Sequence, residues 1–242
     1  MIYVGCSGFP VSRKRYYREM NLVELQETFY NINIERLRKL KEEAPEGFKF
    51  TMKAWQVVTH KKTSPTWRKL RKMPEGVLDN YGYLMPTHEN LMACKEIRKA
   101  ATILGSKILI FQLPPSLKMD QKVYEEMKKF FSKANFKNYI IGVEPRNKTW
   151  YEKKELMEEL FFNFNIVHVV DIFKRHPIDS GDIFYLRLHG LNGEINYRYR
   201  YNDKDLRELK RKITELEKKK DVYVLFNNIY MFESAKIFLK YL

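Results

Sequence analysis

FYLRLHG, residues 184–190, is an apolar and aromatic run that ends in an arginine, a histidine and a glycine. Runs of this length and composition are typical of buried strands. Side chains alternate between the two faces of a strand, so Arg187 and His189 are predicted to share one face. Two such polar side chains are unexpected at the end of a buried strand, and the order of the other elements along the chain accounts for them.

The rest of the chain repeats this strand-like character at regular intervals. The runs lie at residues 2–6, 23–29, 48–53, 107–113, 139–144, 166–171, 183–190 and 222–227. Between them are helical patterns at residues 34–44, 88–105, 124–134, 153–164, 205–220 and 234–242. Strands that alternate with helices pair in parallel, and eight such units in about 250 residues match a TIM barrel. The sequence predicts one α/β domain over residues 1–242, a single (β/α)8 TIM-like barrel.

Two segments depart from this regular alternation. Only the short KRYYREM, residues 14–20, links the first two strands. A long basic and aromatic stretch, residues 55–86, precedes the helical pattern at residues 88–105. Long segments of this kind often carry function, and we expect this one to lie over the barrel mouth.

Composition restricts the function classes. The 45 Lys and Arg residues outnumber the 30 Asp and Glu residues, which gives a net charge of +15. Such a charge attracts polyanions, so nucleic acid or another polyanion is an expected partner; a lysine-rich solvated surface is the alternative explanation. Without an apolar stretch of about 18 residues or a signal-peptide pattern, the chain is predicted to be cytoplasmic and to bind no membrane. Cys6 and Cys94 lack the spacing of a disulfide framework or a zinc site.

Polar residues gather at the predicted strand ends, where the active sites of TIM barrels lie. A ring of charged and amide groups at one face is costly to desolvate unless it binds a ligand. Cys6, Ser7, Gln26 and Thr28 also fall near strand ends. The ring is predicted to comprise Glu24, Lys53, Gln112, Glu144, Arg146, Asp171, Arg187, His189, Asn227 and Asn228.

The same segments resemble those of the DUF72, or YecE-like, family. The resemblance rests on GCSGF (5–9), VELQETFY (23–30), FKFTMKAWQVVTH (48–60), FQLPPS (111–116), VEPRNKTW (143–150), Asp171, YLRLHG (185–190) and YVLFNN (223–228). It implies a TIM barrel and leaves the activity open. The chain departs from the commoner bacterial pattern at Cys6, at Gln26 and Glu27, at Pro145 and in its short first helical segment, which suggests an archaeal-type branch.

The first functional hypothesis is a metal-assisted nuclease or other phosphodiesterase. Glu24, Glu144, Asp171 and His189 would be catalytic; a divalent ion, Mg²⁺ or Mn²⁺, would bind Glu144, Asp171 and His189. Lys53, Gln112, Arg146, Arg187, Asn227 and Asn228 would bind the substrate. Tyr199, between Tyr197 and Tyr201 in the segment YRYRY, would stack on a base. Asp171 beside His189 would set the imidazole tautomer and raise its pKa.

Two other hypotheses stand beside it. An isomerase or hydrolase would use the same ring for acid–base chemistry on a small sugar-like or anionic metabolite, with Glu24 and Glu144 as acid and base. A non-catalytic module would bind a nucleotide or nucleic acid. The sequence has no P-loop, GxGxxG, GxSxG or HExxH motif, so no organic cofactor is implied. In the catalytic hypotheses, alanine at His189, Glu144 or Arg187 is expected to abolish activity and leave the fold intact.

Overall fold

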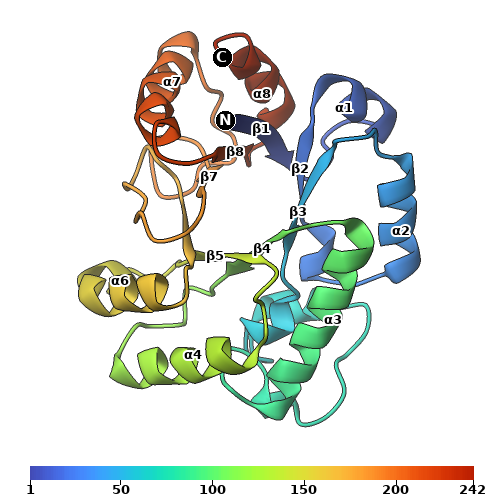
Figure 1. Ribbon diagram of the computed structural model, residues 1–242, viewed down its shortest axis with the longest axis vertical. Helices are drawn as coiled ribbons and strands as arrows, with labels where there is room; N and C mark the ends of the chain where they lie inside the picture. Colours follow the sequence, from blue (N-terminus) through green and yellow to red (C-terminus); the bar gives the residue numbers. More distant parts are fainter.

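The computed structural model describes residues 1–242 and contains a closed barrel of eight parallel strands, in the order β1 to β8. The predicted (β/α)8 barrel is therefore confirmed. Figure 1 shows the helices around the barrel and the two chain ends close together. The strands are β1 (Ile2–Ser7), β2 (Leu22–Leu25), β3 (Lys49–Lys53), β4 (Ile108–Gln112), β5 (Ile140–Glu144), β6 (Val167–Val170), β7 (Phe184–Leu188) and β8 (Val222–Phe226).

The helices follow the strands with one exception. They are α1 (Arg13–Glu19), α2 (Ile34–Glu43), α3 (His88–Leu104), α4 (Gln121–Lys133), α5 (Thr149–Glu152), α6 (Lys154–Asn163), α7 (Asp203–Glu217) and α8 (Met231–Leu239). The short KRYYREM segment forms most of α1. Residues 171–183, between β6 and β7, contain no helix. The sixth connection is therefore a loop that starts directly at the barrel mouth.

The second strand is shorter than the sequence pattern indicated. It ends at Leu25, and Glu27–Phe29 form a 3₁₀ turn, η1. Thr28 is thus outside the strand alternation, and its Oγ1 donates to the Lys53 carbonyl oxygen at 2.7 Å. The turn links the ends of β2 and β3.

The long segment 55–86 contains three 3₁₀ turns, η2 (Gln56–Val58), η3 (Pro65–Lys69) and η4 (Leu78–Asn80). The Asn90 side chain of α3 donates to the carbonyl oxygens of Gly82 at 3.1 Å and Met85 at 2.9 Å. His60 packs on Phe29 of η1, with ring centroids 5.1 Å apart. These contacts hold the segment against α3 and the β2 side of the barrel, so it flanks the mouth.

Strand alternation separates two hydrophobic clusters. The larger one includes Leu186 and Leu188 and packs between strands and helices, whereas Tyr185 and Leu225 belong to a smaller cluster inside the barrel. Arg187 has the same parity as Tyr185, so its side chain points into the barrel above this inner cluster. No helix has the length and apolar character needed to cross a membrane.

Candidate functional site

Arg187 lies at the centre of a buried charge network at the carboxyl end of the barrel. Its side chain is 1% exposed and contacts carboxylates on two other strands. Nη2 lies 3.0 Å from Glu24 Oε1, and Nη1 lies 2.5 Å from Glu144 Oε2. Nη1 also donates to Gln112 Oε1 at 3.3 Å. One guanidinium therefore joins β2, β4, β5 and β7 below the mouth.

Glu24 is fully buried and has its carboxylate satisfied on all sides. Oε1 accepts from Ser7 Oγ at 3.1 Å and from the Gln26 amide, and Oε2 accepts from the Tyr185 hydroxyl at 2.8 Å. Arg187 Nη2 also contacts Oε1, so four side chains surround this carboxylate. This geometry favours a role for Glu24 in anchoring Arg187, and its catalytic role stays a prediction.

Glu144 is held between two guanidinium groups. Arg146 Nη2 lies 2.8 Å from Oε1, opposite the Arg187 contact on Oε2. Burial raises the pKa of Glu144, but Arg146 and Arg187 outweigh burial and lower this pKa to about 2. The carboxylate is therefore ionised at neutral pH, which suits a stabilising anion and not a proton donor.

His189 is buried beside this carboxylate as a neutral imidazole. Its Nε2 lies 3.0 Å from Arg146 Nη2 and 3.7 Å from Glu144 Oε1. Because an arginine can only donate, Nε2 accepts and the proton lies on Nδ1. Burial, with Arg187 and Arg146 nearby, lowers the pKa of His189 well below its ordinary value, although Glu144 raises it.

Asp171 acts on the backbone and not on the imidazole. Its Oδ2 accepts from the His189 backbone N–H at 2.9 Å, whereas His189 Nδ1 is 4.0 Å away. Oδ1 accepts from the Phe173 N–H at 3.1 Å. The prediction that Asp171 would raise the pKa of His189 is wrong, because burial and the arginines dominate. Burial also raises the pKa of Asp171 itself.

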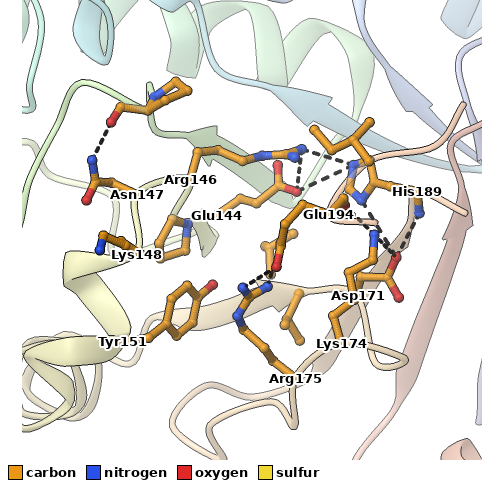
Figure 2. Close-up of a pocket in the computed structure, with 15 residues that line it drawn as sticks. Glu144, Arg146, Asn147, Lys148, Tyr151, Asp171, Lys174, Arg175, His189 and Glu194 are labelled. Carbon is orange, nitrogen blue, oxygen red and sulfur yellow. Dashed lines mark hydrogen bonds and ion pairs between the residues drawn. The ribbon is translucent and has the colours of Figure 1, made fainter. Parts of the chain in front are cut away.

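A cavity of about 250 Å³ opens beside His189, between the ends of β5, β6 and β7. Figure 2 shows the side chains of Arg146, Tyr151 and Arg175 around it. Arg146 is its central cation, and the Nε of this residue is buried without a hydrogen-bond partner. Lys148, Lys174 and Arg175 add three further cations, and Glu144, Asp171 and Glu194 contribute carboxylates.

Glu194 comes from the loop after β7 and crosses the cavity to the loop after β6 (Figure 2). Its carboxylate accepts from Arg175 Nη1 at 2.9 Å and Nη2 at 2.7 Å, and its carbonyl oxygen accepts from Lys174. The Glu194 side chain is 72% exposed, so water competes for this ion pair. The sequence analysis missed Lys174, Arg175 and Glu194. The one available signal was that Lys174 and Arg175 closely follow the end of the sixth strand.

Other predicted residues have internal partners outside the cavity. The Tyr199 hydroxyl donates to Asp205 at 2.7 Å, and Asn228 Nδ2 donates to the Tyr199 carbonyl oxygen at 2.8 Å. These contacts brace the loop after β7, whereas Asn228 Oδ1 is buried without a hydrogen-bond partner. Asn227 is half-buried at the end of β8. Burial raises the pKa of the Cys6 thiol to about 12, which favours its protonated form at neutral pH.

The residues predicted to hold Mg²⁺ or Mn²⁺ do not fit a divalent ion in this arrangement. Both Glu144 oxygens face guanidinium groups, and His189 Nε2 accepts from Arg146. Across the whole chain, no group of three or more His, Cys, Asp or Glu side chains could hold a metal ion. Arginines occupy the positions beside Glu144 where a cation would have to bind.

Comparison with known proteins identifies relatives over the whole barrel. Residues 11–240 match a family described as "Protein of unknown function DUF72". The UPF0759 protein YunF of Bacillus subtilis (strain 168) is 25% identical over an alignment 269 residues long, which takes in 94% of this chain and 89% of that protein. A DUF72 family protein from Thermotoga maritima has a solved structure with a TM-score of 0.72, 24% identity and coverage of 100% and 98% of the two chains.

More distant solved structures share the barrel. Endonuclease IV from Thermus thermophilus has a TM-score of 0.56 and 12% identity, with 99% of this chain and 100% of that chain covered. A D-psicose 3-epimerase from Clostridium cellulolyticum has a TM-score of 0.56 and 11% identity, with coverage of 99% and 97%. At such identities the likeness shows the fold alone, since one barrel supports many chemistries.

Proposed function

We propose, for a chain that belongs to the DUF72 family of proteins of unknown function, that the cavity at the barrel mouth binds a small anionic metabolite and that His189 moves a proton on it. This is the acid–base hypothesis of the sequence analysis. It is favoured over metal-assisted hydrolysis because arginines, and not free carboxylates, surround Glu144.

The observation that carries the proposal is the bidentate grip of Arg175 on Glu194. A guanidinium binds two carboxylate or phosphate oxygens in the same planar geometry. Glu194 is exposed and comes from a loop with positive-φ residues at Asn192 and Gly193, so a soluble anion can replace it without disturbing the barrel. The Glu194 carboxylate stands in for an anionic group of the substrate. The unpartnered Arg146 Nε offers a second donor.

The proton-transfer step uses the neutral imidazole. A general base must be unprotonated at the working pH, and the lowered pKa of His189 fulfils this condition. Nε2 now accepts from Arg146; when the anion draws that guanidinium away, Nε2 is free to take a proton from the substrate. Glu144, 3.7 Å from Nε2, then stabilises the imidazolium.

Replacing Glu194 with Gln is expected to tighten the binding of inorganic phosphate or ribose 5-phosphate by up to about fivefold, because an exposed ion pair is worth at most about 1 kcal/mol. Replacing Arg175 with Met is expected to weaken binding at least about tenfold, since a hydrogen bond to a charged group contributes about 1.5–3 kcal/mol. Isothermal titration calorimetry measures both effects.

The exposed pair of Arg38 and Glu35 on α2 supplies matched controls. Arg38→Met and Glu35→Gln make the same changes in charge at a site remote from the cavity, so phosphate affinity should stay at the wild-type value. If neither anion binds the wild type or Glu194→Gln, the anion site is refuted.

A nucleic acid is the second candidate substrate, because an aromatic and basic strip borders the cavity. Tyr197 and Tyr230 are 47% and 37% exposed, and the Arg200 guanidinium lies 5.5 Å from the Tyr230 ring centre. The Ile229 N–H donates to the Tyr197 carbonyl oxygen at 2.8 Å, which joins the loops after β7 and β8. The Tyr197 ring is 6.3 Å from that of His189. Exposed aromatic faces next to cations are suited to stacked bases.

In this second case, the protein is expected to cut end-labelled single- or double-stranded DNA or RNA, and His189→Ala is expected not to. Replacing both Arg198 and Arg200 with Met should weaken binding and lower the slope of affinity against salt by about one per lost phosphate contact. The assay is run with Mg²⁺, with Mn²⁺ and with EDTA.

Each outcome of this assay is informative. Cutting that EDTA abolishes would support the metal-assisted nuclease. Absence of cutting under every condition, by a folded protein, would remove the nuclease candidate.

A further inference from the structure

Lys53 is a buried amine at the catalytic end of the barrel that the proposed function does not use. It is the last residue of β3, and its alternation with Thr51 places its side chain inside the barrel. Only 6% of the residue is exposed. Gln112, its neighbour on β4, is half-buried at the same rim. The amine therefore lies directly below the mouth.

No carboxylate pairs with this amine. Lys53 Nζ donates to Gln112 Oε1 at 3.1 Å and lies 3.9 Å from the centre of the Phe29 ring. The two glutamates of the network are both engaged by Arg187 instead. Lysines are seldom buried without an anionic partner, so Lys53 differs from most lysines that serve only to stabilise a fold.

The surroundings favour the neutral form of the amine. Burial, followed by Arg187, lowers the pKa of Lys53 to about 7, with Arg146 acting in the same direction. Glu24 and Glu144 raise this pKa but do not outweigh burial. His60, the other titratable group nearby, has its own pKa lowered to about 4 by burial and by Lys53, so it adds no charge at neutral pH. A neutral, desolvated lysine is nucleophilic.

We infer that Lys53 forms an imine with the carbonyl carbon of an aldehyde or ketone. The lone pair of the neutral amine forms the C–N bond, and the carbonyl oxygen leaves as water with the two hydrogens that this amine carried. The imine nitrogen then takes one proton from solvent to give the protonated imine, and no oxidant or reductant is consumed. Gln112 Oε1 accepts from both Lys53 Nζ and Arg187 Nη1, and this shared acceptor orients the amine. Imine formation at Lys53 is separate from anion binding in the cavity and does not depend on it.

The test uses glyoxylate, a carbonyl compound small enough for a nearly closed site, with sodium cyanoborohydride. Reduction of the imine converts the lysine to carboxymethyl-lysine, which peptide mass spectrometry locates. At pH 7 Lys53 is expected to react at least about tenfold faster than Lys49 on the same strand, because an ordinary lysine amine, of pKa about 10.4, is almost entirely protonated there. Above pH 8 the rate at Lys53 should level off.

Controls separate nucleophilicity from folding and from the anion site. Lys53→Arg keeps a long side chain with N–H donors but has no nucleophilic amine, so it should lose the label at this position, while Lys49→Met should leave Lys53 labelling unchanged. In about 8 M urea, which unfolds most small domains, Lys53 and Lys49 should be labelled at equal rates. A rate at Lys53 no higher than at Lys49 in the folded protein, or a rate that keeps rising above pH 8, refutes the inference. Phosphate binding by Lys53→Arg at the wild-type affinity shows that such a failure concerns Lys53 alone.

Discussion

Replacing Arg187 with Met is expected to lower the free energy of unfolding by about 3–5 kcal/mol, the usual cost of removing one partner of a buried ion pair. The change leaves Glu24 and Glu144 as neighbouring buried carboxylates without their shared cation. For a chain of this size the midpoint of thermal unfolding should fall by about 10 °C. Urea and thermal denaturation at pH 7, followed by circular dichroism, measure both values.

This result would differ from the expectation drawn from the sequence, in which Arg187 was a rim residue and its loss left the fold intact. The exposed Arg38→Met variant is the control and should cost less than about 1 kcal/mol, because its partner Glu35 lies in solvent. An Arg187→Met protein as stable as the wild type would show that the guanidinium does not stabilise the barrel.

Acid titration gives an independent measure of the same network. The pKa of Glu144 falls from 4.5 to about 2 in the folded protein, so the unfolded chain takes up this proton first as the pH falls. Stability from Glu144 is therefore fully present above about pH 4.5 and is lost between there and pH 2. Because Arg187 contributes to this lowered pKa, the stability lost between pH 4.5 and pH 2 should be smaller in Arg187→Met than in the wild type.

Replacing His189 with Gln is expected to reduce the rate of proton transfer by about 10²- to 10⁴-fold, the usual contribution of a general base. Glutamine can still accept a hydrogen bond from Arg146 but cannot take up a proton at neutral pH. The measurement is solvent exchange in D₂O, followed by proton NMR, on a panel of triose, tetrose and pentose phosphates. The largest loss should appear on whichever compound the wild type exchanges fastest.

His60 provides the matched control, since it is also buried and neutral but hydrogen-bonds to Thr59 outside the cavity. His60→Gln should retain wild-type exchange. If His189→Gln exchanges as fast as the wild type, or if the wild type exchanges none of the panel, His189 is not the base for this class of substrate.

The fold could be predicted because buried strands and amphipathic helices leave periodic patterns in the sequence. The errors fell where local contacts override the pattern. VELQETF continues an apolar alternation to Phe29, yet β2 ends at Leu25 because Thr28 bonds to the end of β3. The segment 14–20 is too short to show helical periodicity in the sequence, yet most of it belongs to α1.

The inner layer of the site could also be anticipated. Polar residues at the predicted strand ends pointed to Glu24, Lys53, Glu144 and Arg187, and in the structure these four side chains lie buried at the carboxyl end of the barrel. Partner choice could not be anticipated, because it depends on distances between strands far apart in the sequence. His189 thus bonds to Arg146 and not to Asp171. The outer layer of the cavity comes from loops, which have no periodicity to read.

The pairing of β1 with β8 has a consequence for synthesis of the protein. The two strands bond from Ile2 with Val222 to Cys6 with Phe226, and the Met1 amine also binds Asp221, 220 positions away. A ribosome needs about 10–40 s to add that many residues. Throughout that time the first strand of the nascent chain presents a bare edge to other chains. The barrel can close only after the ribosome has added residues 222–226, so this edge of β1 stays unpaired until then.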